Sequence, residues 1–424
     1  MRLIDGNDPL LEKIFTRKLT EDLAATEQVT EIISLVRQEG DQAVCRLNQR
    51  FSGCTLTPDQ LLVTATELEN AYQAVEADFL AALRLAVENI TAFHRRQLGQ
   101  SWFQTGKNGA ILGQMLRPLR RVGVYVPGGK AAYPSSVLMN VIPAKVAGVA
   151  EIVMVTPPDA AGRINPHTLV AASELGLGAI YKAGGAQGIA ALAYGTDRLA
   201  AVDKITGPGN IYVTLAKRQV YGQVDIDMLA GPSEILIIAD ATANPAYVAA
   251  DLLSQAEHDE RAAMVLLTPS RALAEQVREM APEQARRLPK QQIVERALAN
   301  NGVIVVTDSL AQAFTLANRY APEHLELMLE APWAWLDRVE NAGALFLGHY
   351  APEPLGDYLA GPNHILPTGG TARFYSALGV DSFIKKTSVI SYTPAALKEV
   401  SAPLIKLAEL EGLTAHANAV KVRL

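Results

Sequence analysis

The sequence has few cysteines, no excess of basic charge and no long apolar run. Its 424 residues include only Cys45 and Cys54, too few for a disulfide scaffold or a cysteine-based zinc site. A formal net charge of −6 gives no basic stripe of the kind that nucleic acid requires. No apolar run reaches the roughly 18 residues that span a bilayer, and the amino terminus lacks a signal-peptide pattern. We therefore expect a cytoplasmic protein that binds neither nucleic acid nor a membrane.

The composition and its periodicity predict a large α/β protein. Hydrophobic residues make up 49% of the chain and charged residues 19%, which favours a large buried core, and the length favours two or more domains. Residues 22–39 and 67–97 place apolar side chains three and four positions apart, as helices do. Short β-branched runs then alternate with glycine turns and alanine-rich segments, at 121–129, 151–158, 178–185, 204–210, 234–240, 262–269, 302–308 and 344–348. This alternation predicts two Rossmann-like domains with parallel sheets, and the last forty-odd residues predict a helical tail.

Three glycine-rich turns follow predicted strands. They are Pro127-Gly128-Gly129, the segment 184–188 and the segment 207–210. At the carboxyl ends of parallel strands, such turns bring helix N-termini and their N–H groups toward anionic ligands. None of the three is a G-x-G-x-x-G fingerprint followed by an acid about twenty residues later. Nucleotide binding and simple tight connections therefore both remain open from the pattern.

One helix carries a possible metal-ligand pair. Asn244-Pro245 predicts a helix start, and Gln255 and His258 then lie three positions apart on nearly the same face. Such a pair offers one oxygen and one nitrogen ligand from a rigid element. Because glutamine is an uncommon zinc ligand, an ordinary polar helix end remains the alternative.

A carboxylate and an imidazole are adjacent after Pro322. This proline predicts the end of one helix and leaves Glu323 and His324 near the start of a new one. Two proton acceptors of different pKa suit successive proton transfers. A helix-capping glutamate beside a surface histidine is the alternative.

Two further segments place ionisable residues outside any apolar pattern. Asp357 and His364 lie in a turn-rich segment, and loops on a rigid scaffold often carry functional residues. Glu411 and His416 lie in the tail, where Gly412 and Thr414 break the helical pattern. A frayed terminus with incidental polar residues is the alternative there.

Taken together, these motifs resemble the histidinol dehydrogenase family. The match covers about residues 115–424 and rests, in order, on RVGVYVPGG, KITGPGN, DMLAGPSE, DLLSQAEH, NRYAPEHLEL, GDYLAGPNHILPTGGTAR and EGLTAHANAV. The resemblance implies a homodimeric enzyme that uses NAD and one Zn²⁺ per subunit. It implies oxidation of L-histidinol through L-histidinaldehyde to L-histidine, the last steps of histidine biosynthesis, with two NAD consumed in turn.

The resemblance also implies roles for particular residues. The implied zinc ligands are Gln255, His258, Asp357 and His416. The implied substrate contacts are Ser233, Gln255, His258, His324, Asp357, His364, Glu411 and His416. The implied cofactor contacts are Tyr125, Gln187 and Asn210, one on each glycine-rich turn. For catalysis, His324, with a pKa near neutral, would take the alcohol proton, and Glu323 would activate the water that attacks the aldehyde.

The corresponding division of the chain has four parts. We expect an N-terminal arm at 1–20, an NAD-binding domain at 116–236, a substrate and metal domain at 21–115 plus 237–375, and a tail at 376–424 that reaches the partner subunit. Three rival functions remain: a paralogue that oxidises another polar diol such as a sulfonated one, a zinc hydrolase, and a non-catalytic binding module. The first would need a cationic pocket, whereas Glu411 beside His416 offers an anionic group.

Overall fold

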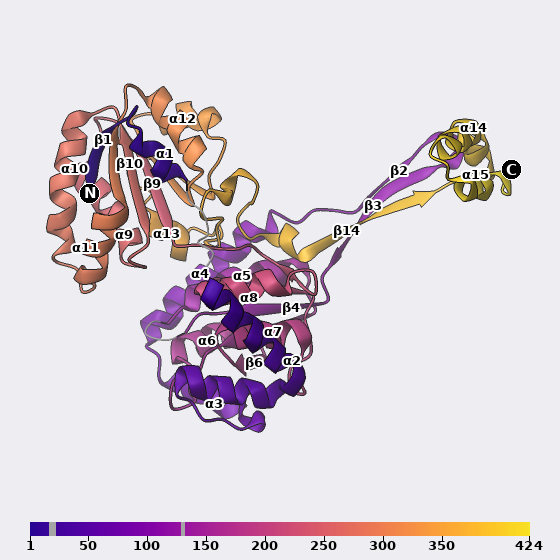
Figure 1. The fold of residues 1–424 in the computed structure, drawn as a ribbon, viewed down its shortest axis with the longest axis horizontal. Helices are drawn as coiled ribbons and strands as arrows, with labels where there is room; N and C mark the ends of the chain where they lie inside the picture. Colours follow the sequence, from indigo (N-terminus) through magenta and orange to yellow (C-terminus); the bar gives the residue numbers. More distant parts are fainter. Residues whose placement is uncertain (17–22, 129–131) are drawn as a thin grey trace.

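Two parallel sheets and one long antiparallel arm organise the computed structural model, which describes residues 1–16, 23–128 and 132–424 (Figure 1). The prediction of two parallel-sheet α/β bodies is confirmed. Among the described helices, none combines the length and the apolar character needed to cross a membrane.

The first body is built on a five-stranded parallel sheet of order β6-β5-β4-β7-β8. Its strands are β4 (Arg121–Tyr125), β5 (Glu151–Thr156), β6 (Ala179–Lys182), β7 (Lys204–Thr206) and β8 (Asp225–Ile226). The connecting helices are α5 (Pro134–Ala147), α6 (Pro166–Glu174), α7 (Gly185–Tyr194) and α8 (Ile211–Val220). Because helices cover both faces of the sheet, the central strand is buried along most of its length, as the continuous apolar run predicts.

The second body is built on a six-stranded parallel sheet of order β1-β11-β10-β9-β12-β13. Its strands are β1 (Arg2–Asp5), β9 (Glu234–Ala239), β10 (Ala263–Thr268), β11 (Gly302–Val306), β12 (His324–Met328) and β13 (Ala344–Leu347). Its helices are α1 (Leu10–Phe15), α9 (Pro245–Ala256), α10 (Arg271–Ala285), α11 (Gln291–Asn301), α12 (Leu310–Tyr320) and α13 (Glu353–Tyr358). The expected N-terminal arm differs from the structure, because β1 is an edge strand paired with β11; residues 17–20 lie outside the described residues.

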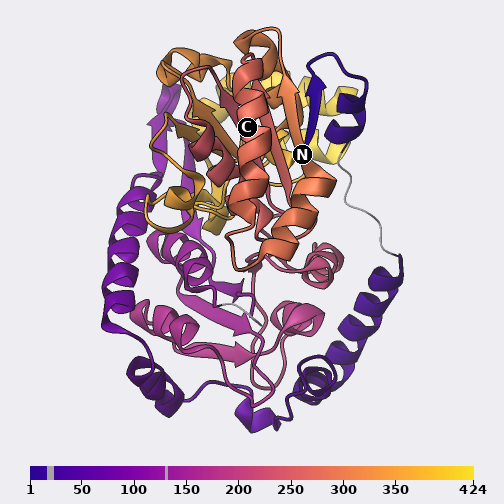
Figure 2. The same cartoon turned by 90° about the vertical axis from the view of Figure 1, so that its left-hand side faces the viewer.

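The N-terminal helices pack on the first body. They are α2 (Leu23–Ser52), α3 (Ala65–Gln73) and α4 (Ala77–Arg95), and they contact α7 and α8, α6, and α5, respectively. Val29 and Val36 of α2 share one buried cluster with Ile189 of α7. Figure 2 shows these helices wrapped around the five-stranded sheet, below the six-stranded one. The structure thus differs from the expected grouping of 21–115 with 237–375, because the apolar faces of these helices are buried against the first body.

An antiparallel arm extends away from both bodies. It consists of β2 (Trp102–Thr105), β3 (Ile111–Pro118) and β14 (Ile384–Ser391), and it carries α14 (Pro394–Leu410) and α15 (Thr414–Lys421) at its far end (Figure 1). The tail is helical from Pro394 onward, as expected, but the expectation of helix alone is wrong for 384–391. That segment pairs with β3 along its full length, and its β-branched residues were the missed signal.

Short 3-10 helices occur in the connections, at η1 (Pro58–Gln60), η2 (Lys107–Gly109), η3 (Pro332–Arg338), η4 (Thr371–Arg373) and η5 (Val380–Phe383).

Candidate active site

A cleft of about 1510 Å³ lies between the two parallel sheets. The first body lines it with residues at the carboxyl ends of its strands, including Tyr125 and the turn 208–210. The second body lines it with residues at the amino ends of its strands, including Ser233, Glu323 and His324. The two sheets therefore present opposite edges to one space.

Two of the three glycine-rich turns reach the cleft. Pro127 and Gly128 line it after β4, whereas Gly129 lies outside the described residues. Asn210 lines it after β7 and caps α8, because its side-chain oxygen accepts the backbone N–H groups of Tyr212 (3.1 Å) and Val213 (3.2 Å).

The third turn lies behind the cleft surface. The backbone N–H of Gly185 donates to the Tyr125 hydroxyl at 3.1 Å, and burial raises the pKa of Tyr125 to about 12. Among the described residues that line the cleft, Gln187 is absent. Its side chain is 2% exposed, and its Nε2 lies 3.4 Å from Oδ1 of Asn48 on α2. Of the expected cofactor residues, Tyr125 and Asn210 face the cleft and Gln187 supports the wall behind it.

The acid/base pair lies at the amino end of a central strand. The expectation that Glu323 and His324 lie near a helix start is wrong, because His324 is the first residue of β12, between β9 and β13. Ala321 ends the preceding helix with a φ of +48°. All five residues of β12 are buried, so two-sided burial rather than helix capping decides the local structure.

Glu323 and His324 are both anchored to the first residue of β9. The Glu323 carboxylate accepts the backbone N–H of Glu234 at 2.8 Å. The His324 Nδ1 lies 2.9 Å from the Glu234 carbonyl oxygen and donates to it, so in the neutral ring Nε2 is the proton acceptor. The backbone N–H and C=O of one residue, at the start of β9, thus orient both groups of the predicted pair.

Burial shifts the pKa values of the two groups in opposite directions. Burial lowers the pKa of His324 to about 4, which differs from the expected value near neutrality. Burial raises the pKa of Glu323 well above its usual range, and the nearby carboxyls of Glu234, Asp357 and Glu353 raise it further. Without a neighbouring cation, the site therefore favours a neutral imidazole and a protonated Glu323.

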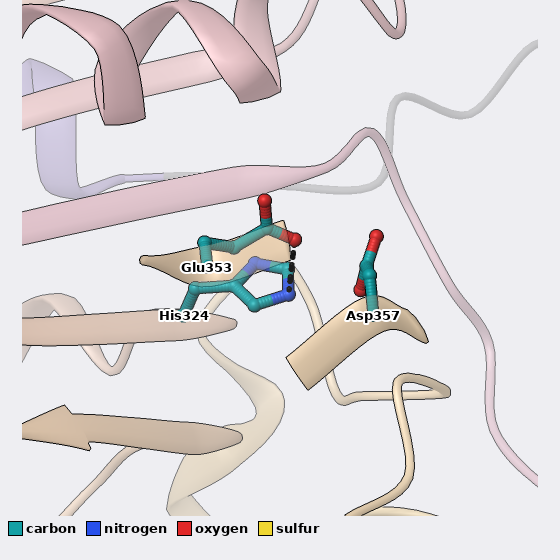
Figure 3. Close-up of side chains that lie close together, drawn as sticks. All are labelled: His324, Glu353 and Asp357. Carbon is teal, nitrogen blue, oxygen red and sulfur yellow. Dashed lines mark ion pairs between the residues drawn. The ribbon is translucent and has the colours of Figure 1, made fainter. Parts of the chain in front are cut away.

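The structure adds Glu353, a residue that the sequence analysis did not select. The segment expected as a turn-rich loop begins with the helix α13, and Glu353 and Asp357 lie four positions apart on one face of it. The Glu353 carboxylate lies 3.6 Å from Nε2 of His324 and accepts the Ser254 hydroxyl at 3.1 Å. Figure 3 shows the side chains of Glu353, His324 and Asp357 close together. One nitrogen or oxygen atom of each lies within 4.8 Å of those of the other two, so the three could hold a metal ion. The four-residue spacing after a proline was the available signal.

The second body offers donors that fit a divalent cation. Gln255 is 1% exposed and lines the cleft. Within the described part of the chain, neither atom of its amide makes a hydrogen bond of ordinary geometry, although the amide lies near enough to Glu353 to lower the pKa of that carboxyl. His258 and Asp357 line the same cleft, and burial raises the pKa of Asp357 to about 6. Burial likewise raises the pKa of Glu353 to about 8. A bound metal ion would supply positive charge to the buried carboxyls and would accept a lone pair of the amide oxygen. A set of nitrogen and oxygen ligands suits zinc, manganese or cobalt.

Two further predicted substrate residues also lie in the cleft. Ser233 directly precedes β9. His364 follows α13, and its Nδ1 donates to the Asp357 carbonyl oxygen at 3.0 Å. Burial lowers the pKa of His364 to about 4, so its ring is neutral at physiological pH.

The remaining two predicted residues are far from this cleft. Glu411 and His416 are exposed at the end of the arm, well away from both bodies of the same chain (Figure 1). The helices that carry them also expose Leu407, Leu410 and Leu413. The structure therefore brings these two residues to no other predicted site residue of their own chain among those it describes.

Comparison with known proteins identifies the family. Residues 15–424 match the family model described as histidinol dehydrogenase. The chain belongs to this family. A histidinol dehydrogenase of Heliobacterium mobile is 56% identical over 424 residues, covering 100% of this chain and 99% of the relative. One of Moorella thermoacetica is 55% identical over 421 residues, covering 99% of each chain.

A solved structure agrees with the family assignment. The crystal structure of histidinol dehydrogenase from Elizabethkingia anophelis matches with a TM-score of 0.95 at 39% identity, covering 100% of this chain and 98% of that one. The resemblance drawn from the motifs is confirmed, and the chain is an oxidoreductase of the histidinol dehydrogenase family.

Proposed function

We propose that the protein is a cytoplasmic homodimeric enzyme that oxidises L-histidinol to L-histidine through L-histidinaldehyde, with two NAD and one Zn²⁺ per subunit. The observation that carries this proposal is the cleft itself, in which glycine turns of one sheet face the Glu323–His324 pair of the other. Bound NAD supplies the hydride acceptor, and bound zinc supplies a fixed positive centre that holds the imidazole and amine nitrogens of the substrate.

The residues divide between the two binding tasks. Tyr125 and Asn210 line the cofactor side of the cleft, and Gln187 holds the turn behind it. Gln255, His258 and Asp357 hold the metal together with His416 of the partner subunit. Substrate contacts come from Ser233, His324 and His364, from the metal ligands, and from Glu411 of the partner subunit. The carboxylate of that glutamate suits the positive groups of histidinol.

In the first oxidation, His324 removes the alcohol proton. Its Nδ1–H is committed to the Glu234 carbonyl, so Nε2 takes the proton as the hydride leaves the substrate carbon. The low pKa of the buried ring keeps Nε2 unprotonated throughout the physiological range. The products of this step are the aldehyde, NADH and one proton.

In the second oxidation, Glu323 activates water. Its carboxylate takes a proton from the water that adds to the aldehyde. The resulting hydrate gives a hydride to the second NAD and a hydroxyl proton to solvent, which leaves the acid. Since burial raises the pKa of Glu323, its carboxyl must first lose its own proton before it can accept one from water. A thiohemiacetal route is not used, because Cys45 and Cys54 lie on or after α2 and are absent from the described residues that line the cleft.

The arm supplies the last two groups to a second copy. Glu411 and His416 are remote from their own cleft, and a symmetric dimer that exchanges arms would complete both sites. Burial of Leu407, Leu410 and Leu413 against the partner would stabilise this arrangement.

NADH production from L-histidinol tests this function. We expect two NADH per histidinol, loss of activity with loss of about one zinc per subunit after chelation, and recovery on zinc addition. If the protein oxidises a sulfonated diol but not histidinol, the proposed cofactor stands and the proposed substrate is wrong. No NADH from any alcohol would reject the oxidation itself.

A further inference from the structure

A buried ion pair holds both polar groups of one glycine in the cofactor turn. The carboxylate of Asp227 accepts the backbone N–H of Gly207 at 2.7 Å, and the Lys217 ammonium donates to the Gly207 carbonyl oxygen at 3.0 Å. Lys217 and Asp227 also pair directly with each other. The peptide groups on either side of Gly207 are therefore fixed from opposite ends by one pair of charges.

Gly207 is a residue at which small shifts matter. Its φ of +117° is one that side-chain-bearing residues rarely adopt, and a Cβ there would lie 2.0 Å from the Tyr125 carbonyl oxygen. The turn is thus pressed against the last residue of β4, and Pro208, Gly209 and Asn210 follow directly into the cleft. A rotation of the Gly207 peptide would displace the turn that faces the ligand.

The pair does not touch the cleft. The side chains of Lys217 and Asp227 are 3% and 1% exposed, and neither is among the described residues that line the cleft. Lys217 lies inside α8, and Asp227 directly follows β8. The ion pair would therefore affect a bound ligand through the position of the 207–210 turn and not by direct contact.

The same pair anchors the start of the connection between the two bodies. Asp227 begins the segment that runs from β8 to β9, and its carboxylate also accepts the Met228 N–H at 2.6 Å. Further along, Thr214 of α8 donates to the Ala230 carbonyl oxygen at 3.2 Å. Ala230, which lies nearer to Ser233 in the cleft, is thus held by Thr214 independently of the ion pair, and the pair fixes only the first residues of the connection.

We propose that Lys217 and Asp227 are positioning residues that set the 207–210 turn for the dinucleotide. This inference rests on the proposed NAD-dependent function. The ion pair is electrically neutral as a whole, so it acts by geometry and not as a counter-charge for the pyrophosphate. Its loss should weaken cofactor binding specifically and leave the substrate and metal side unchanged.

The test compares a double variant with one control variant that removes a different ion pair. Removing one partner alone would leave a buried charge unpaired, so Lys217→Met is combined with Asp227→Leu. The control is Lys204→Met, which removes the Lys204–Asp225 ion pair (2.8 Å) of the same sheet. That pair lies at the amino ends of β7 and β8, whereas Gly207 follows the carboxyl end of β7. The measurements are the equilibrium Kd of NADH by fluorescence, without histidinol, the KM values of NAD and histidinol, and the thermal midpoint.

We expect the double variant to raise the Kd of NADH and the KM of NAD at least tenfold, with the KM of histidinol changed less than twofold. The control should lose thermal stability without a change in NADH affinity. Unchanged NADH affinity in a folded double variant would overturn the inference, as would equal increases in both KM values.

The double variant could fail to fold, or the unmodified protein could fail to bind NADH, and each outcome has its own interpretation. If the double variant fails to fold, Lys217→Met combined with Asp227→Asn replaces it. This combination leaves no buried charge unpaired and keeps an acceptor for the Gly207 N–H, but removes the Lys217 donor to the Gly207 carbonyl oxygen. It should weaken NADH binding at least threefold, and no change would overturn the inference. If the unmodified protein does not bind NADH, the proposed function is wrong and this inference falls with it. Binding by the unmodified protein together with unaffected variants rejects the positioning role alone.

Discussion

The two sheets face one cleft with opposite edges and opposite chemistry. The five-stranded sheet presents its carboxyl edge, where Asn210 caps the N-terminus of α8 beside the cleft. The six-stranded sheet presents its amino edge, where α9 ends between Gln255 and His258. A helix N-terminus carries partial positive charge and a C-terminus partial negative charge. One wall therefore favours anions such as a pyrophosphate, and the other favours cations such as a metal or an ammonium group.

The two walls also differ in whether backbone groups or side chains carry the function. On the first wall, formed by the five-stranded sheet and its turns, backbone groups and glycines make up much of the surface. Few ionisable side chains lie there among the described residues. On the second wall, Glu323, His324 and Glu353 are buried and Asp357 is half-buried. Burial favours the neutral form of all four side chains, so the three carboxyls need a neighbouring positive charge to ionise. Changes on the first wall should alter cofactor affinity, whereas changes on the second should alter chemistry and metal binding.

The largest effects should come from the acid/base pair of the second wall. We expect His324→Ala to reduce alcohol oxidation by about 10²–10⁴-fold, because the proton acceptor is lost. Glu323→Gln should spare aldehyde formation and slow acid production, yielding about one NADH per site before a slow phase. Stopped-flow NADH absorbance measures both. Equal loss of the two oxidations in Glu323→Gln would contradict the division of labour.

The same pair defines the pH dependence. Because burial raises the pKa of Glu323, the second oxidation should be slow at low pH and should accelerate as the pH rises and the carboxylate forms. His324, with a pKa of about 4, should add no titration near neutrality. Acid production as a function of pH, with L-histidinaldehyde as substrate, measures this, and Glu323→Gln should remove the acidic limb.

The next effect tests whether the second wall is shared between subunits. His416→Ala and His324→Ala should each be inactive, but mixed dimers should contain one intact site, because the functional arm and the functional core come from different chains. Unfolding and refolding the two variants together in equal amounts should restore about a quarter of the normal activity. A mixture no more active than its components would contradict arm exchange.

A smaller effect is expected on the first wall. Asn210→Ala removes the cap of α8, which should lower the free energy of unfolding by about 1 kcal/mol. It should also raise the KM of NAD with little change in the KM of histidinol. Urea unfolding and steady-state kinetics measure the two effects, and a selective rise in the histidinol KM would contradict the assignment of the two walls.

The smallest effect concerns the contact between the two bodies. His94 of α4 is buried, and its Nε2 lies 3.4 Å from Nδ2 of Asn363, the residue before His364. Burial lowers the pKa of His94, so its stabilising neutral form is present above its unfolded pKa of about 6.5 and stability falls as the pH decreases below that value. Urea midpoints at pH 7.5 and 5.5 should differ less in His94→Gln. An unchanged difference would assign the acid sensitivity to other groups.

Much of the fold could be predicted because apolar runs reveal buried strands. The continuous run around Ile235–Ile238 predicts a central parallel strand, and β9 is buried at every position. By contrast, the start of β12 lies in a sequence whose proline and charged residues suggest a helix start. Only tertiary pairing with β9 and β13 makes it a strand. The antiparallel arm was missed for a different reason. Its strands are exposed, so no buried apolar run marks them, and the β-branched residues of 384–391 are the signal that remains.

The site was predictable where a motif marks it and not where folding alone creates it. The family resemblance places Gln255, His258, Asp357 and His324 together, and all of them line the cleft. For Glu353 the sequence offers only the four-residue spacing to Asp357 after a proline, and its place in the site depends on the close approach of α13 to the amino end of β12. The pKa of His324 was equally inaccessible, since burial sets it and a sequence does not show burial.

The most direct test of the two-wall account compares Gly207→Ala with His324→Ala in NADH affinity and in turnover. The account predicts that Gly207→Ala weakens NADH binding, because a Cβ would collide with the Tyr125 carbonyl, and that His324→Ala binds NADH normally but turns over about 10²–10⁴-fold more slowly. Normal NADH affinity in Gly207→Ala, or a comparable loss of NADH affinity in His324→Ala, would contradict it.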